Sequence, residues 1–454
     1  MADQPLTGPI TTVQLQDGTT VPFYVVPFDA DGACSGPRAA ADAVADAAGA
    51  TDVFLFSHGW NNNWKDATDR YYDFLHQFSA LRGQRWEPPT RPYRPVLVGI
   101  FWPSEALVSG DDQAPDIAAE TGLPADRLAA AGAQRSELDL LAQRIPAADR
   151  ERFYELADAG SLDDAAADEL TALLAPALAG PPDELGDPGE PPTPKDLKVI
   201  WEQLPAGGSG GPVSTDTGGL IDDGAPAGPG PETAGLLDVL KKLDPRQLVR
   251  AATVLLMKDR AGRVGARGVH DLLGRLVAAS PDVRVHLVGH SYGGKVVLSA
   301  LCAGDPPVRP VDSVLLLEPA MSALCFATDV DGTGRPGGYR AALERSRLPI
   351  LTTFSGHDVP LTKLFHLAVR RASDLGEAVI AGVPLPSRYA ALGGFGPYGC
   401  DADSVVVQPA AAPAGYPLSG PKRVVAVQGD SIISGHGAVT NPATAWMLLD
   451  QVMS

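Results

Sequence analysis

The residue with the clearest capacity for chemistry is a serine predicted to lie in a tight turn. Ser291 is the centre of the pentapeptide GHSYG, and a further glycine follows it. An apolar run at 283–288 predicts a buried strand before the turn, and residues 295–301 predict a packed helix after it. Glycines around the serine permit a strained backbone that raises its hydroxyl above a sheet, beside the free N–H groups of the helix N-terminus. This pattern predicts a nucleophile, the alternative being a glycine-rich turn with an incidental serine.

A serine hydroxyl becomes a good nucleophile only beside a base, and three histidines follow Ser291 in the chain. His436 lies between two glycines in a loop after the last predicted strand, and we predict that it is the base. His366 falls in an apolar helical segment, which is typical of a histidine without a catalytic role. His357 is next to Asp358, and neighbouring side chains of an extended backbone point in opposite directions, so only one of this pair can serve the site.

The base in turn needs an acid that fixes its tautomer. Asp358 follows a predicted strand and lies between Ser291 and His436 in the chain, which gives the order Ser, Asp, His expected of a nucleophile elbow. Glu318, at the end of the preceding predicted strand, is a competing acid, although a glutamate before proline can also simply end a strand. We therefore favour Asp358 and keep Glu318 as the alternative acid.

An acyl-transfer site also needs two backbone N–H groups that stabilise an oxyanion. One is predicted to be the N–H of Tyr292, the residue after the nucleophile. The other is predicted to be that of Trp60, because the turn His58-Gly59-Trp60 follows an early strand. The alternative for His58 is a structural histidine in a turn. The three asparagines after Trp60 are predicted to order the loop through side-chain hydrogen bonds to its backbone.

Short apolar runs separated by helical segments predict the scaffold that holds these residues. Alternating strands and helices predict an α/β fold with a mostly parallel central sheet covered by helices on both faces. In such sheets functional groups gather at the carboxyl ends of the strands, where each polar cluster described above lies. The predicted strands are 51–57, 95–102, 283–288, 312–317, 349–355 and 422–427, with a hairpin in 11–28 and helices at 38–48, 64–78 and from about 442.

A change of composition divides the chain into a core and a large insertion. The core is predicted to comprise residues 1–104 and 265–454, and the insertion residues 105–264. The first part of the insertion is predicted to be helical, and its segment 179–234 is so rich in Pro and Gly that we expect part of it to be a disordered loop. Helical patterning returns at residue 236 and runs to about residue 279, with a predicted interruption near 260–262.

Composition narrows the classes of partner and compartment. The chain has 454 residues and a formal net charge of −19, which argues against nucleic acid or an anionic membrane surface as an electrostatically driven partner. No apolar stretch reaches the roughly 20 residues that span a bilayer, and no signal peptide is visible, so we expect a cytoplasmic protein, with leaderless export still open. The spacing of the four cysteines predicts neither a metal site nor a disulfide framework. No pattern indicates the oligomeric state.

Together these motifs resemble the α/β-hydrolase superfamily, and within it the bacterial serine hydrolases with an HGxNN-type oxyanion loop. The resemblance covers residues 51–103 and 280–450 and rests on FSHGWNNNWKDA, GHSYGG, FSGHDVPLTKLFHLA, RYAALGGFGP and ISGHGAVTNPATAWMLL. It implies an α/β-hydrolase fold and an esterase, lipase or related acyl hydrolase. Such an enzyme acts on a small-molecule acyl substrate through Ser291, Asp358 and His436, without a metal or cofactor. The insertion lies outside the resemblance.

Three interpretations of function follow from the sequence. The first is a serine hydrolase that cleaves a carboxylic ester through an acyl-enzyme, with an amide or thioester as the alternative bond. The second is a catalytically silent hydrolase scaffold that acts as a protein-interaction module. The third is a lipid-surface enzyme, which the sequence favours least and which would need an exposed apolar patch around Trp60 and Trp102.

Overall fold

A nine-stranded sheet is the centre of the fold in the computed structural model. The structure describes residues 8–14, 18, 20–60, 62–85, 93–104, 138–178, 193, 194, 197, 245–330, 332–364 and 390–454. The strand order is β1-β2-β4-β3-β5-β6-β7-β9-β8, and every neighbouring pair is parallel except β1 with β2. The prediction of an α/β protein with a mostly parallel sheet is therefore confirmed. The strands are Thr11–Gln14 (β1), Thr20–Pro27 (β2), Asp52–Ser57 (β3), Pro95–Phe101 (β4), Arg284–His290 (β5), Ser313–Leu317 (β6), Ile350–Phe354 (β7), Ser404–Val407 (β8) and Val424–Gln428 (β9).

The predicted strands are confirmed because continuous apolar runs form the middle of the sheet. Every residue of β3 and of β6 is buried, as expected for parallel strands covered on both faces. The predicted hairpin is β1 with β2, which pair in antiparallel register from Gln14 opposite Thr20. The edge strand β8 was not predicted, because its four residues are half-buried or exposed and too few to show a strand pattern.

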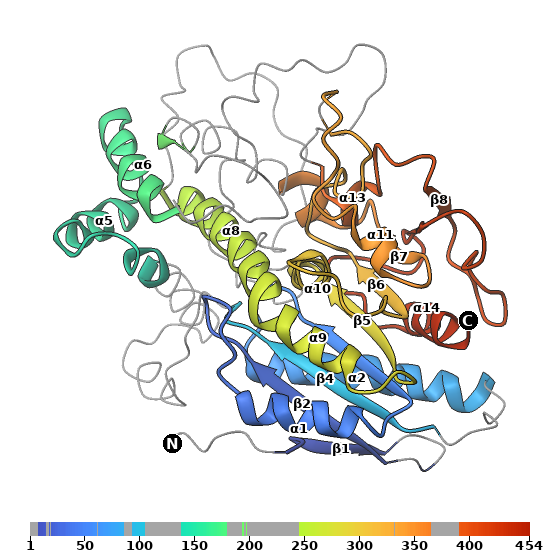
Figure 1. Cartoon of the computed structure of the whole chain (residues 1–454). Helices are drawn as coiled ribbons and strands as arrows, with labels where there is room; N and C mark the ends of the chain where they lie inside the picture. Colours follow the sequence, from blue (N-terminus) through green and yellow to red (C-terminus); the bar gives the residue numbers. More distant parts are fainter. Residues whose placement is uncertain are drawn as a thin grey trace, which may run out of the picture.

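Helices cover both faces of the sheet (Figure 1). The helices α1, α9 and α10 pack on one face, with the end of α8, while α2 and α14 pack on the other. Alternate residues of β3 divide between the two faces, since Leu55 belongs to the first hydrophobic cluster and Phe54 and Phe56 to the second. The longer helices are Pro37–Ala47 (α1), Trp64–Arg85 (α2), Arg150–Ala157 (α5), Asp164–Leu178 (α6), Pro245–Val264 (α8), His270–Ala278 (α9), Tyr292–Cys302 (α10) and Pro442–Met453 (α14), and the short ones are Ala342–Arg345 (α11) and Leu392–Phe395 (α13).

The described part of the insertion has a hydrophobic cluster of its own. Figure 1 shows α5, α6 and the first half of α8 extending away from the sheet, and their apolar side chains pack together. The second half of α8 instead packs against the core of the sheet through Val254, Met257 and Ala261. Residues 105–137 and nearly all of 179–234, for which helices and a disordered loop were predicted, lie outside the described residues. None of the described helices is long and apolar enough to cross a bilayer.

The interruption predicted near residues 260–262 lies at residues 265–269 instead. Helix α8 continues to Val264, because Ala261 is fully buried in the core and holds the helix against it. The irregularity comes just afterwards, as a π-helical turn at Gly265–Val269. There the backbone approaches α10 so closely that a Cβ atom on Gly265 would lie 2.3 Å from the carbonyl oxygen of Val296.

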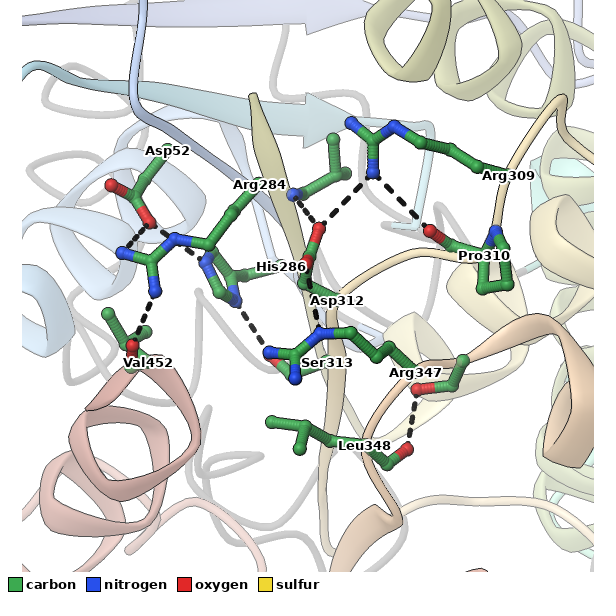
Figure 2. A network of polar contacts seen from close by, with 12 residues as sticks. Asp52, Arg284, His286, Arg309, Pro310, Asp312, Ser313, Arg347, Leu348 and Val452 are labelled. Atoms are coloured by element: carbon green, nitrogen blue, oxygen red, sulfur yellow. Dashed lines mark hydrogen bonds and ion pairs between the residues drawn. The ribbon is translucent and has the colours of Figure 1, made fainter. Parts of the chain in front are cut away.

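A polar network ties the amino ends of β3, β5 and β6 together (Figure 2). Asp52 Oδ1 lies 2.7 Å from Arg284 Nη2 and 3.1 Å from His286 Nε2, while His286 Nδ1 lies 2.8 Å from the Ser313 hydroxyl. Arg284 also donates to the carbonyl oxygen of Val452 near the end of α14. Burial acts to raise the pKa of Asp52, but the histidine and arginine together hold that pKa below its ordinary value. Three adjacent strands and the last helix are thus joined at this end of the sheet.

Candidate active site

The turn between β5 and α10 holds Ser291 in a strained conformation. Its φ and ψ are 55° and −126°, a region that side-chain-bearing residues rarely adopt. Glycines are required around it, since a Cβ atom on Gly289 would lie 2.6 Å from the Gly293 oxygen, and one on Gly293 would lie 2.0 Å from the Ser57 oxygen. The serine is therefore fixed at the carboxyl end of β5, at the N-terminus of a buried helix.

The structure brings Ser291, His436 and Asp358 into one hydrogen-bonded line. His436 Nε2 lies 2.8 Å from Ser291 Oγ, and His436 Nδ1 lies 2.6 Å from Asp358 Oδ2. The carboxylate accepts, so Nδ1 carries the proton and Nε2 is left to accept the serine hydroxyl proton. The exposed fractions of the serine and histidine are 4% and 5%, and the aspartate is fully buried. In this geometry the histidine is placed to act as a base and the aspartate to orient it.

The loops that carry the aspartate and the histidine are fastened to one another by Asp430. Its Oδ1 accepts the N–H of Gly356 at 2.6 Å, and the Ser355 hydroxyl donates to the carbonyl oxygen of Ile433 at 3.1 Å. Although its partial burial acts in the opposite direction, hydrogen bonds from Gln428 and Gly356 lower the pKa of Asp430. Sequence reasoning missed this residue, although an aspartate two residues after the last strand was a detectable sign of a loop anchor.

The HGW loop lies directly against the nucleophile. A Cβ atom on Gly59 would lie 2.7 Å from Ser291 Cβ, so the glycine is required for this close approach. Tyr292 is the first residue of α10, and its N–H therefore has no acceptor within the helix. Within the described residues, the Trp60 N–H makes no hydrogen bond either. The two predicted donors thus come from the residue after the serine and from the loop that packs against it, and neither N–H has a partner among the described residues.

The loop is held by His58, which is fully buried. Its ring stacks on Trp102 with centroids 5.4 Å apart, and its Nδ1 donates to the Gly59 carbonyl oxygen at 2.8 Å. Burial lowers the pKa of His58 to about 4, so the ring is neutral at neutral pH. Asn62 donates to the carbonyl oxygens of Gly59 and Trp60, which confirms the prediction that asparagines order this loop. His58 therefore supports the loop, and Asn61 lies outside the described residues.

A second histidine, His290, contacts the backbone of the proposed base. Its Nε2 donates to the carbonyl oxygen of His436 at 2.9 Å, while its Nδ1 has no hydrogen-bond partner among the residues that the structure describes. Burial, followed by the charge of Arg70, holds the pKa of His290 well below its ordinary value. A neutral imidazole that donates in this way fixes the position of His436. The residue was part of the predicted turn, but no role was assigned to it.

Glu318 lies beside Asp358 rather than against His436. It has φ 42° and, with Ser291, is one of two non-glycine residues of the described chain with positive φ. The side chain is fully buried beside Asp358 and the Thr353 hydroxyl, and among the described residues neither carboxyl oxygen makes a hydrogen bond of good geometry. Burial, followed by the negative charge of Asp358, raises the pKa of Glu318 well above its ordinary value. Glu318 is thus a neutral neighbour of the aspartate, and Asp358 is the acid that contacts the histidine.

The remaining candidates contribute no reactive group to this line. His357 is exposed, and His366 lies outside the described residues. Among the described residues, no three His, Cys, Asp or Glu side chains gather as metal ligands. A second Ser–His–Asp line does exist, formed by Ser313, His286 and Asp52 at the opposite end of the sheet. All three are fully buried, so this arrangement is structural.

Comparisons of the chain with protein-family models, with curated proteins and with solved structures find no match.

Proposed function

We propose that this protein is a serine hydrolase with an α/β-hydrolase fold that cleaves a carboxylic ester through an acyl-enzyme. His436 Nε2 removes the proton of Ser291 as the serine oxygen attacks the acyl carbonyl carbon. Asp358 keeps the proton of His436 on Nδ1 and stabilises the imidazolium that forms. The N–H groups of Trp60 and Tyr292 stabilise the negative oxygen of the tetrahedral intermediate.

Collapse of that intermediate releases the alcohol, which takes its proton from His436. The acyl group is then an ester of Ser291. His436 next removes a proton from water, the hydroxide attacks the acyl carbon, and a second tetrahedral intermediate breaks down to the carboxylic acid. The serine recovers its proton from the same histidine, so the enzyme is regenerated without any other reactant.

The observation that carries the proposal is the strained, hydrogen-bonded Ser291. A backbone at φ 55° costs of order 1–3 kcal/mol and persists at sites where it positions a functional group. A silent scaffold needs neither that strain nor the 2.8 Å and 2.6 Å contacts of His436. The lipid-surface interpretation is weakened, because Trp60 is 4% exposed and Trp102 fully buried and the two form no exposed apolar patch.

Labelling with a fluorophosphonate probe tests the proposal directly. The wild type should react, whereas Ser291→Ala and His436→Ala should not, because the first lacks the nucleophile and the second its base. Ser434→Ala and His357→Ala are matched controls, since both residues are exposed and lie in the same two loops. A folded wild-type protein that takes up no label, or labelling that survives Ser291→Ala, would contradict the proposal.

The bond that is cleaved is tested with matched substrates. Nitrophenyl esters of increasing acyl length, the corresponding anilides and the corresponding thioesters share one acyl group and differ in the leaving group. We expect the esters to be hydrolysed fastest. A thioester or anilide preference would keep the mechanism and change the class of substrate.

A further inference from the structure

Three arginines gather where α8 passes the end of β4. Arg260 and Arg263 are three residues apart on α8 and therefore share one face of the helix. Arg144 joins them from the first described segment of the insertion. The exposed fractions of Arg260 and Arg263 are 4% and 7%, which is unusual for a residue type that is seldom buried unless paired.

The hydrogen-bonding capacity of this arginine cluster is largely unused. Arg260 Nη1 donates to the carbonyl oxygen of Pro103 at 2.6 Å, and Arg144 Nη1 donates to that of Ala177 at 3.3 Å. Within the described residues Arg263 makes no hydrogen bond and no ion pair, and its Nε and Nη2 are buried without a partner, as is Arg260 Nε. Leaving buried donors of a charged group unpaired is costly, so the cluster is incomplete as it stands.

Like positive charges act on one another within the cluster, because burial and then the charge of Arg263 lower the pKa of both Arg144 and Arg260. Asp31 and Asp259 are acidic neighbours whose charges offset this effect in part. Burial, followed by the charges of Arg144 and Arg263, lowers the pKa of Arg260 to about 10. A protein with a net charge of −19 thus concentrates like positive charges at one buried place.

The cluster lies behind the loop of the candidate active site. Pro103, which accepts from Arg260, follows Trp102, and the Trp102 indole both stacks on His58 and donates to its carbonyl oxygen at 3.1 Å. The same helix also reaches the nucleophile elbow, because the Tyr292 hydroxyl donates to the Val254 carbonyl oxygen at 3.3 Å. At a rise of 1.5 Å per residue, Arg260 lies about 9 Å along α8 from Val254, the residue that contacts Tyr292.

We propose that Arg144, Arg260 and Arg263 form a binding site for an oxyanion, a carboxylate or a phosphate, at the end of the substrate remote from the scissile ester. Guanidinium groups bind both anions through paired N–H donors, and the unpartnered Nε and Nη2 of Arg263 form such a pair. The assignment to substrate rests on the proposed esterase function, whereas the oxyanion site itself does not.

Binding of inorganic phosphate and of succinate to the full-length protein tests the site, by calorimetry at constant ionic strength with chloride as the reference anion. We expect one of the two anions to bind, and the better one to identify the class of ligand. Arg263→Gln should weaken that binding at least about tenfold, because charge-assisted hydrogen bonds are lost. Arg275→Gln, at an exposed arginine of α9, should leave it unchanged.

Arg263→Met is a second variant that removes the charge and keeps the apolar stem, should the glutamine variant fold poorly. The site would be overturned if the wild type bound neither anion, or if both Arg263 variants bound as tightly as the wild type. It would also be overturned if Arg275→Gln weakened binding as much as Arg263→Gln, because that result indicates general screening by positive charge.

The substrate assignment is tested separately with nitrophenyl hemisuccinate and nitrophenyl butyrate, which differ in the anionic end of the acyl group. Arg263→Gln should raise KM for the hemisuccinate about tenfold and leave KM for the butyrate unchanged. Equal effects on both esters would remove the assignment to substrate. If neither ester is cleaved but the anion still binds, the proposed hydrolase function fails and the oxyanion site stands.

Discussion

Replacing Glu318 with glutamine should stabilise the protein more as the pH rises. The folded protein holds this buried carboxyl next to Asp358, and burial, followed by the charge of Asp358, raises its pKa well above the ordinary value of 4.5. The folded state therefore keeps a proton near neutral pH that the unfolded chain releases. Because the unfolded state binds fewer protons, the free energy of unfolding of the wild type falls as the pH rises from about 4.5 towards the raised pKa.

The size of the effect follows from proton linkage. One proton bound only in the folded state costs about 1.4 kcal/mol of stability for each pH unit. As long as the carboxyl stays protonated, the wild type loses about 3 kcal/mol between pH 5 and pH 7 through this residue. Glutamine has nearly the same shape and does not titrate. The stability difference between Glu318→Gln and the wild type should therefore grow by that amount over the same range.

Urea unfolding of both proteins at several pH values measures this difference, and subtraction cancels the titrating groups that do not interact with Glu318. Glu344→Gln is the matched control, because Glu344 is exposed and its replacement should give a difference independent of pH. Retained fluorophosphonate labelling of Glu318→Gln would show that the active-site loops are still folded. A Glu318→Gln difference that stays constant with pH would mean that Glu318 is ionised in the folded protein.

Three further changes have expected outcomes. Gly293→Ala should prevent stable folding, because its Cβ would lie 2.0 Å from the Ser57 oxygen, and circular dichroism and expression level would detect this. Asp358→Asn should keep the fold but slow ester hydrolysis by about 10⁴-fold, since the histidine then adopts the wrong tautomer, and a rate near wild type would argue against the proposed acid. The pKa of His58 is about 4 in the folded protein and 6.5 in the unfolded chain, so on acidification the unfolded chain binds the proton at a higher pH. The free energy of unfolding is therefore highest above about pH 6.5 and falls as the pH is lowered towards 4. His58→Gln should flatten that fall in urea unfolding between those pH values, and an unchanged slope would assign it to another group.

Sequence alone determined the sheet and the nucleophile turn, because both depend on local patterns. Continuous apolar runs such as residues 53–56 form strands that are buried on both faces of a parallel sheet. The turn at Ser291 is equally local, since its glycines are required by atoms of the same strand and helix and of the neighbouring strand. The four-residue edge strand Ser404–Val407 escaped prediction, as its pairing with Val424–Gln428 and not its composition makes it a strand.

Only the tertiary structure decided which acid contacts the histidine and which buried charges remain unpaired. Asp358 and Glu318 both follow strands, but the 2.6 Å contact of His436 joins residues 78 positions apart, and no local pattern specifies it. The same holds for Arg144 and Arg263, which meet from distant parts of the chain. The continuation of α8 through residue 260 likewise depends on packing against the core. Contacts of this kind depend on how the helices and the sheet pack against one another. The distances between these side chains and the shifts of their pKa values therefore exist only in the folded chain.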